Sequence, residues 1–117
     1  MSRSATKLSD AWQSAEREAL SSLNLRAEFE SLGVDFDRGE ASPRGWLACH
    51  AMGREDRNAS AAVNLSTGRY RDLGGEGLSL SFWEFAARFG NRFASWKDAR
   101  EFYLRKAGVR LPRGRPA

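Results

Sequence analysis

Residues 44–85 read RGWLACHAMGREDRNASAAVNLSTGRYRDLGGEGLSLSFWEF, and the predicted sheet lies within them. Residues 45–49 form a short apolar run typical of a strand, and residues 61–65 return as a second strand after a polar loop. Gly68 then supplies a turn, and residues 69–73 make the second arm of a hairpin. We therefore expect a small antiparallel sheet at the centre of the chain.

Two helices are predicted before this sheet. From Ser9, apolar residues up to Leu23 keep to one helical face. Asn24 is expected to cap a second helix, which stops at Gly33. Residues 34–37 are expected to form a further short strand.

Two more helices are predicted after the sheet. Ser81 and Glu84 have the spacing of a capping box, and Ser95 and Asp98 repeat it. Glycines follow both helices. The expected buried faces are Phe82, Phe85, Ala86 and Phe89 in the first helix and Trp96, Ala99, Phe102 and Tyr103 in the second. The fold class predicted is α+β, a small antiparallel sheet packed with about four helices.

The order of these motifs resembles the N-terminal zinc-binding domain of bacterial and phage DNA primases, over roughly residues 24–112. In that family a zinc ribbon helps the enzyme to select its single-stranded template. The matching positions are Cys49, the loop at residues 56–60, Val63-Asn64, Gly68, Tyr70 and the helix start at residues 82–85. The resemblance implies a zinc-ribbon-like sheet with helices packed on one side.

The zinc ligands of that family are not kept. Cys49-x2-Met52 and Asp72-x2-Gly75 stand where the family has Cys-x2-His and Cys-x2-Cys. A structural zinc site needs four thiolate or imidazole ligands, and the whole chain has one cysteine and one histidine, Cys49 and His50. We therefore predict a metal-free ribbon without a cofactor. A zinc ion shared by Cys49 and His50 of two chains is the alternative.

The composition is that of a folded intracellular domain. The chain has 117 residues, 41% of them hydrophobic, and four tryptophans. A single cysteine excludes an internal disulfide and fits a reducing compartment, and no apolar run has the length of a membrane helix. The sequence thus predicts a cytoplasmic protein without a membrane partner, and it fixes no oligomeric state.

We divide the chain into an N-terminal helix at residues 1–23, a ribbon-like domain at residues 24–108 and a basic linker or tail at residues 109–117. The tail has no periodicity and holds prolines and arginines. In the primases the catalytic polymerase domain follows at this point. Either the chain is the front of a longer primase-like enzyme, or it is a free-standing relative.

Positive charge gathers in the second part of the chain. Residues 1–40 hold five basic and eight acidic residues, whereas residues 41–117 hold fourteen basic and seven acidic ones. Sixteen of the nineteen basic residues are arginine, which favours bidentate contacts with phosphate and stacking on bases. A coding bias toward arginine would give the same count.

The predicted hairpin places Arg69 and Arg71 on one face of the sheet and Tyr70 and Asp72 on the other. An arginine-rich sheet face with aromatic rings suits single-stranded nucleic acid, because phosphates need countercharge and bases stack. The alternative without a functional role is that the arginines form a solvent-exposed face and the aromatic side chains belong to the core. The residues predicted to bind nucleic acid are Arg54, Arg57, Arg69 and Arg71 for phosphate, beside Arg44, with Tyr70 or Trp46 as a stacking platform.

Catalysis is not predicted. The glycines at residues 74–77 lack the lysine of a phosphate-binding loop, and Cys49 and His50 are strand neighbours that point apart. Asp56 and Asn58 are expected to shape their loop. The predicted function is non-catalytic binding of single-stranded DNA template for a replication protein. The alternative is a protein-interaction module that kept the ribbon fold and lost both metal and DNA binding.

Overall fold

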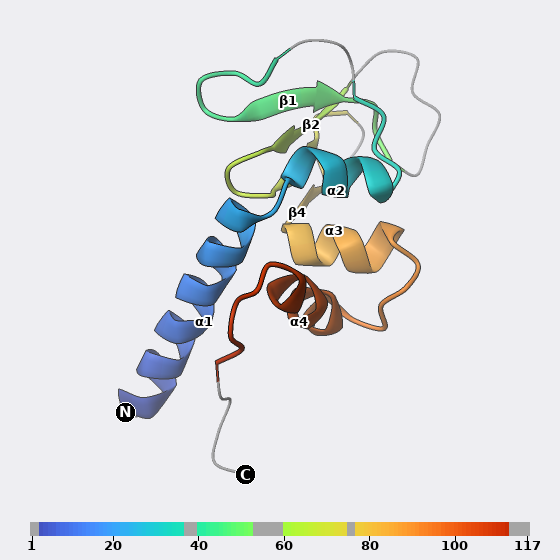
Figure 1. The fold of residues 1–117 in the computed structure, drawn as a ribbon. Coiled ribbons are helices and arrows are strands. Elements are labelled where there is room, and N and C mark those ends of the chain that lie inside the picture. Colours follow the sequence, from blue (N-terminus) through green and yellow to red (C-terminus); the bar gives the residue numbers. More distant parts are fainter. Residues whose placement is uncertain (1–2, 37–39, 53–59, 75–76, 113–117) are drawn as a thin grey trace.

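The computed structural model describes residues 3–36, 40–52, 60–74 and 77–112, and within them the chain forms four helices and one four-stranded antiparallel sheet (Figure 1). The predicted α+β class is confirmed. None of the described helices is long and apolar enough to span a membrane. In chain order the elements are α1 (Arg3–Ser22), α2 (Leu25–Ser31), β1 (Trp46–Cys49), β2 (Ala61–Asn64), β3 (Tyr70–Asp72), β4 (Ser79–Leu80), α3 (Phe82–Phe89) and α4 (Trp96–Lys106).

The strands lie in the order β1-β2-β3-β4, each antiparallel to its neighbour. Leu47 is paired with Val63, Val63 with Tyr70, and Tyr70 with Leu80, so these four residues form one row across the sheet. All four are buried, because side chains directly opposite each other share a face. This row defines the inner face of the sheet.

Aromatic rings from α2 and α3 cover the inner face. The Phe29 ring of α2 meets Phe82 and Phe85 of α3 edge to face, with ring centroids 5.1 Å apart in both pairs. The ring of Tyr70 in β3 lies 4.9 Å from that of Phe85. All four side chains are inaccessible to solvent or nearly so. The core is thus an aromatic layer between the sheet and two short helices.

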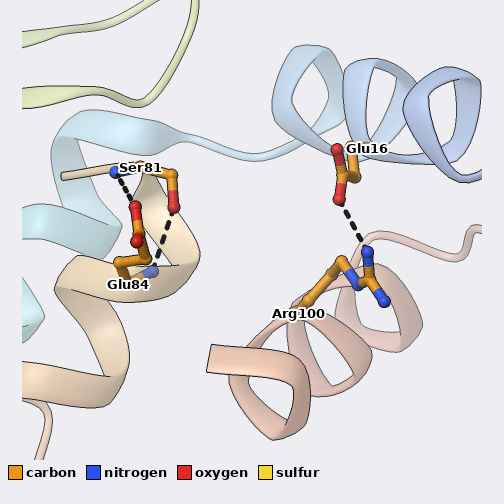
Figure 2. A network of polar contacts seen from close by, with 4 residues as sticks. All are labelled: Glu16, Ser81, Glu84 and Arg100. Atoms are coloured by element: carbon orange, nitrogen blue, oxygen red, sulfur yellow. Dashed lines mark hydrogen bonds and ion pairs between the residues drawn. The ribbon is translucent and has the colours of Figure 1, made fainter. Parts of the chain in front are cut away.

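Side-chain caps set where the helices begin. Asn24 Oδ1 accepts a hydrogen bond from the Ala27 backbone N–H, as predicted for the start of α2. Ser81 and Glu84 form both hydrogen bonds of the predicted capping box (Figure 2). Ser95 Oγ accepts a hydrogen bond from the Asp98 N–H at the start of α4. Such caps satisfy backbone donors that the first turn leaves without helical partners.

Helix α1 begins at Arg3, six residues before the predicted start at Ser9, and packs against α4. Ala15 and Ala19 are buried in the same core as the sheet residues. Arg100 of α4 pairs with Glu16 of α1, with 3.0 Å between Nη1 and Oε2 (Figure 2). The N-terminal helix therefore shares one core with the ribbon-like part of the chain.

Two expectations for local structure were wrong. Residues 34–37 were expected to form a strand, but their described part makes only an isolated bridge between Phe36 and Cys49. Trp96 and Phe102 were expected on the buried side of α4, yet they are 40% and 36% exposed. Helix α4 packs through Ala99, Tyr103 and Leu104 instead, which leaves both rings at the edges of the contact.

Candidate nucleic-acid interface

The outer face of the sheet, opposite the aromatic core, carries three of the residues for which a nucleic-acid role is predicted: Trp46, Arg69 and Arg71. Ala48 is paired with Ala62, Ala62 with Arg71, and Arg71 with Ser79, in one row across all four strands. Ala48, Arg71 and Ser79 are exposed, and Ala62 is half-buried. The methyl groups of Ala48 and Ala62 therefore lie side by side as a small apolar floor that ends at Arg71.

Trp46 and the two hairpin arginines border this floor. The Arg71 Cζ atom lies 5.9 Å from the centroid of the half-buried Trp46 ring. Arg69, which precedes β3, is exposed and donates a hydrogen bond from Nη1 to Ser79 Oγ over 3.1 Å. The structure thus brings Arg69 and Arg71 together on one face, as the alternation of the hairpin predicts, and places Trp46 beside them. We call Trp46, Ala48, Ala62, Arg69, Arg71 and Ser79 the outer-face site.

Tyr70 does not belong to this site, so its prediction as a stacking platform was wrong. Its side chain is fully buried and packs against Phe85 and Phe89. Its hydroxyl oxygen accepts a hydrogen bond from the Met52 N–H over 2.9 Å. Because Tyr70 lies between two outward-facing arginines on a strand, the pleat turns its ring to the core.

The remaining predicted phosphate contacts divide into two groups. Arg54 and Arg57 lie outside the described residues, as do Asp56 and Asn58. Arg44 is described and exposed, and its backbone carbonyl accepts a hydrogen bond from the side chain of Asn64 over 3.0 Å.

Asn64 is a residue of the site region whose role the sequence analysis missed. Its Oδ1 accepts hydrogen bonds from the backbone N–H groups of Ser66 and Thr67, over 2.8 and 3.0 Å. The backbone N–H of Asn64 donates a hydrogen bond to the backbone carbonyl of Arg69. One asparagine thus fixes the turn before Arg69 and the backbone of Arg44. An asparagine that ends a strand before Ser-Thr-Gly is the signal that could have identified this turn.

Of the positions that match the family's zinc ligands, Cys49 and Asp72 lie on the inner side of the sheet. Cys49 is paired with Ala61 and Ala61 with Asp72, so Cys49 and Asp72 face the same way with a strand between them. Both are buried, whereas Met52 is half-buried, and Gly75 lies outside the described residues. Asp72 Oδ1 accepts a hydrogen bond from the Gly74 N–H over 2.9 Å. Across the described ranges, no group of three or more His, Cys, Asp or Glu side chains could hold a metal ion.

Comparison of the chain with protein-family models, with curated proteins and with solved structures found no match. The resemblance to the primase zinc-binding domain therefore stays a prediction.

Proposed function

We propose that this chain is a non-catalytic domain that binds single-stranded DNA on the outer face of its sheet and engages template for a replication protein in the cytoplasm. The observation that carries the proposal is the placement of Arg71 over the Trp46 ring, next to Arg69 and the alanine floor. The resemblance to the primase domain supports the same function from the sequence.

Each component of the site matches one need of a single strand. Arginine supplies countercharge and paired N–H donors for phosphate oxygens. An indole ring offers a stacking surface to any base, and a base–aromatic stack contributes about 1–3 kcal/mol. The alanine floor leaves room for a ribose–base unit because no long side chain rises from it. The exposed Arg44 precedes β1 at the same end of the sheet as Trp46.

The proposal is tested by fluorescence anisotropy with a labelled dT oligomer of about 20 nucleotides, at about 50 mM and about 150 mM salt. We expect binding that weakens linearly on a log–log salt plot. Each phosphate contact on a single strand contributes about 0.7 to that slope, so Arg69→Ala/Arg71→Ala should reduce it by about 1.4. Trp46→Ala should weaken binding by roughly tenfold and leave the slope unchanged.

The matched control is Arg17→Ala/Arg105→Ala, which removes the same charge from exposed positions on α1 and α4. If this control reduced affinity and slope as much as the outer-face pair, binding would reflect net charge and not this site. Absence of binding at low salt by a protein with a folded circular dichroism spectrum would contradict the proposal.

A second candidate function is a protein-interaction module. It is favoured by Trp96 and Phe102, the exposed rings on α4, because exposed aromatic side chains are enriched in protein interfaces. Such a module would be indifferent to DNA in the same titration. If the wild-type protein does bind DNA, a Trp96→Ala/Phe102→Ala variant that kept the full affinity would show that the α4 rings form a surface separate from the outer-face site.

A further inference from the structure

We infer that the outer-face site binds single strands without reading the base or the sugar, so that RNA and DNA of any sequence are equivalent ligands. The inference rests on the proposed function and specifies the ligand class of the same site. It follows from what the floor and rim of the site offer to a nucleotide.

Base readout needs hydrogen-bonding groups that face the edge of the base. The floor consists of the methyl groups of Ala48 and Ala62, which have none. The strand backbone beneath them is engaged in the ladders of β1, β2 and β3. A base above the floor therefore meets apolar surface, which contacts the face of any base and does not read its edge.

Asn64 is the one amide side chain on this side of the described sheet, directly opposite Trp46. It is 5% exposed, and three hydrogen bonds hold it: two into Oδ1 from Ser66 and Thr67 and one from Nδ2 to the Arg44 carbonyl. An amide that reads adenine needs both its oxygen and its nitrogen. The Asn64 amide could bind adenine only if it gave up its hydrogen bonds to Ser66, Thr67 and Arg44.

The polar side chains within the outer-face site are Arg69, Arg71 and Ser79, and the Trp46 indole adds one N–H donor. Ser79 Oγ accepts the hydrogen bond from Arg69, and Arg71 lies over the Trp46 ring. This placement suits phosphate contact and stacking. A ribose 2′-hydroxyl needs a dedicated donor or acceptor to be recognised, and the floor supplies neither.

The test compares labelled oligomers of about 20 nucleotides at one salt concentration: dT, dC, rU, and dT with a guanine at every fourth position. We expect dissociation constants that agree within about fivefold. The guanine-containing strand is included because arginine is the side chain that reads guanine best. A preference beyond about fivefold for any of them would overturn the inference.

Trp46→Ala provides the second measurement. If the indole stacks on bases regardless of identity, its loss weakens all four complexes by the same factor. A loss confined to one oligomer would mean that the ring helps to read that base, and would overturn the inference. Failure of the proposed function has a different signature, since none of the oligomers would then bind.

Discussion

Gly68 occupies a position in the β2–β3 turn where a side chain would be poorly tolerated. It has a left-handed backbone with φ +76°, and a Cβ there would lie 2.9 Å from Phe82 Cβ and 3.0 Å from Leu20 Cδ2. It thus lets the β2–β3 turn approach both α1 and α3. Any larger residue would push these elements apart.

We expect Gly68→Ala to lower the free energy of unfolding by about 3 kcal/mol, as the sum of left-handed strain and overpacking. Gly108→Ala is the matched control, because Gly108 has φ +77° and open space around its Cα. It should cost about 1 kcal/mol, from backbone strain alone. Urea unfolding measures both, and equal losses would contradict the packing argument.

Tyr103 makes stability depend on pH in the alkaline range. Burial raises the pKa of Tyr103 above its ordinary value of 10.0, the carboxylate of Glu28 raises it further, and Arg92 lowers it. The folded state therefore favours the neutral phenol. Above the ordinary pKa the unfolded chain binds fewer protons at this residue than the folded one, so the free energy of unfolding decreases as pH rises.

For the wild-type protein we expect this loss to begin near about pH 10 and to continue toward the raised pKa. Tyr103→Phe keeps the aromatic ring and removes the ionisable hydroxyl group. The free energy of unfolding of this variant should therefore decline less between about pH 9 and about pH 11. Urea unfolding of both proteins across that range gives the difference. Parallel curves would show that Tyr103 does not titrate differently in the two states.

At the scale of elements, α1 is held to α4 by a guanidinium between two indole rings. Arg100 Cζ lies 3.7 Å from the Trp12 ring centroid and 4.9 Å from that of Trp96, and Nη1 pairs with Glu16 (Figure 2). Arg100 Nε is buried, and no described group accepts its hydrogen. Stacking and one ion pair thus replace a full set of hydrogen bonds.

We expect Arg100→Ala to destabilise the protein by about 2 kcal/mol and to speed hydrogen exchange along α1. Arg100→Lys should recover only part of this, since an ammonium group cannot stack between two rings. Arg105→Ala breaks the exposed pair with Glu101 and should cost less than about 0.5 kcal/mol. Unchanged exchange in α1 of Arg100→Ala would show that Ala15 and Ala19 suffice to dock the helix.

The sequence predicted those features of the elements that local chemistry controls. Asn24, Ser81 and Ser95 cap helices where expected, because each side chain bonds to a backbone group three residues away. Strand alternation also fixed the outward direction of Arg69 and Arg71. The same alternation placed Tyr70 on the opposite face, which is consistent with its burial. Its prediction as a stacking platform for bases disagreed with that alternation.

Features that depend on distant contacts were not predictable in this way. Trp96 fits the helical period of the buried face, but it lies in the first turn of α4 and stacks on Arg100 instead of entering the core. Strand β4 has two residues and owes its existence to pairing with Tyr70 and Arg71. The role of Asn64 could not be predicted, because it depends on where the Arg44 backbone and the turn at Ser66 and Thr67 lie relative to each other.

At the scale of the whole molecule, the described part of the chain is held together by side-chain packing. In small zinc domains, metal binding supplies the free energy of folding, about 10–16 kcal/mol. Here Phe29, Tyr70, Phe82 and Phe85 form a contiguous buried layer, and a 2.7 Å ion pair between Lys106 and Glu28 links α4 to α2. Helices α2 and α3 supply the rings that cover the inner face of the sheet, and α1 adds Ala15 and Ala19 to the same core.

We therefore expect an excess of chelator to leave the Tm unchanged within about 2 °C, and the purified protein to carry less than about half an equivalent of zinc per chain. Cys49→Ala is the matched variant: it loses some packing, because Cys49 is fully buried, but its Tm should be equally indifferent to chelator. A Tm that fell with chelator in the wild type and not in Cys49→Ala would place a metal at this thiol. Stability would then depend on the ion, and the core described above would be insufficient to hold the sheet.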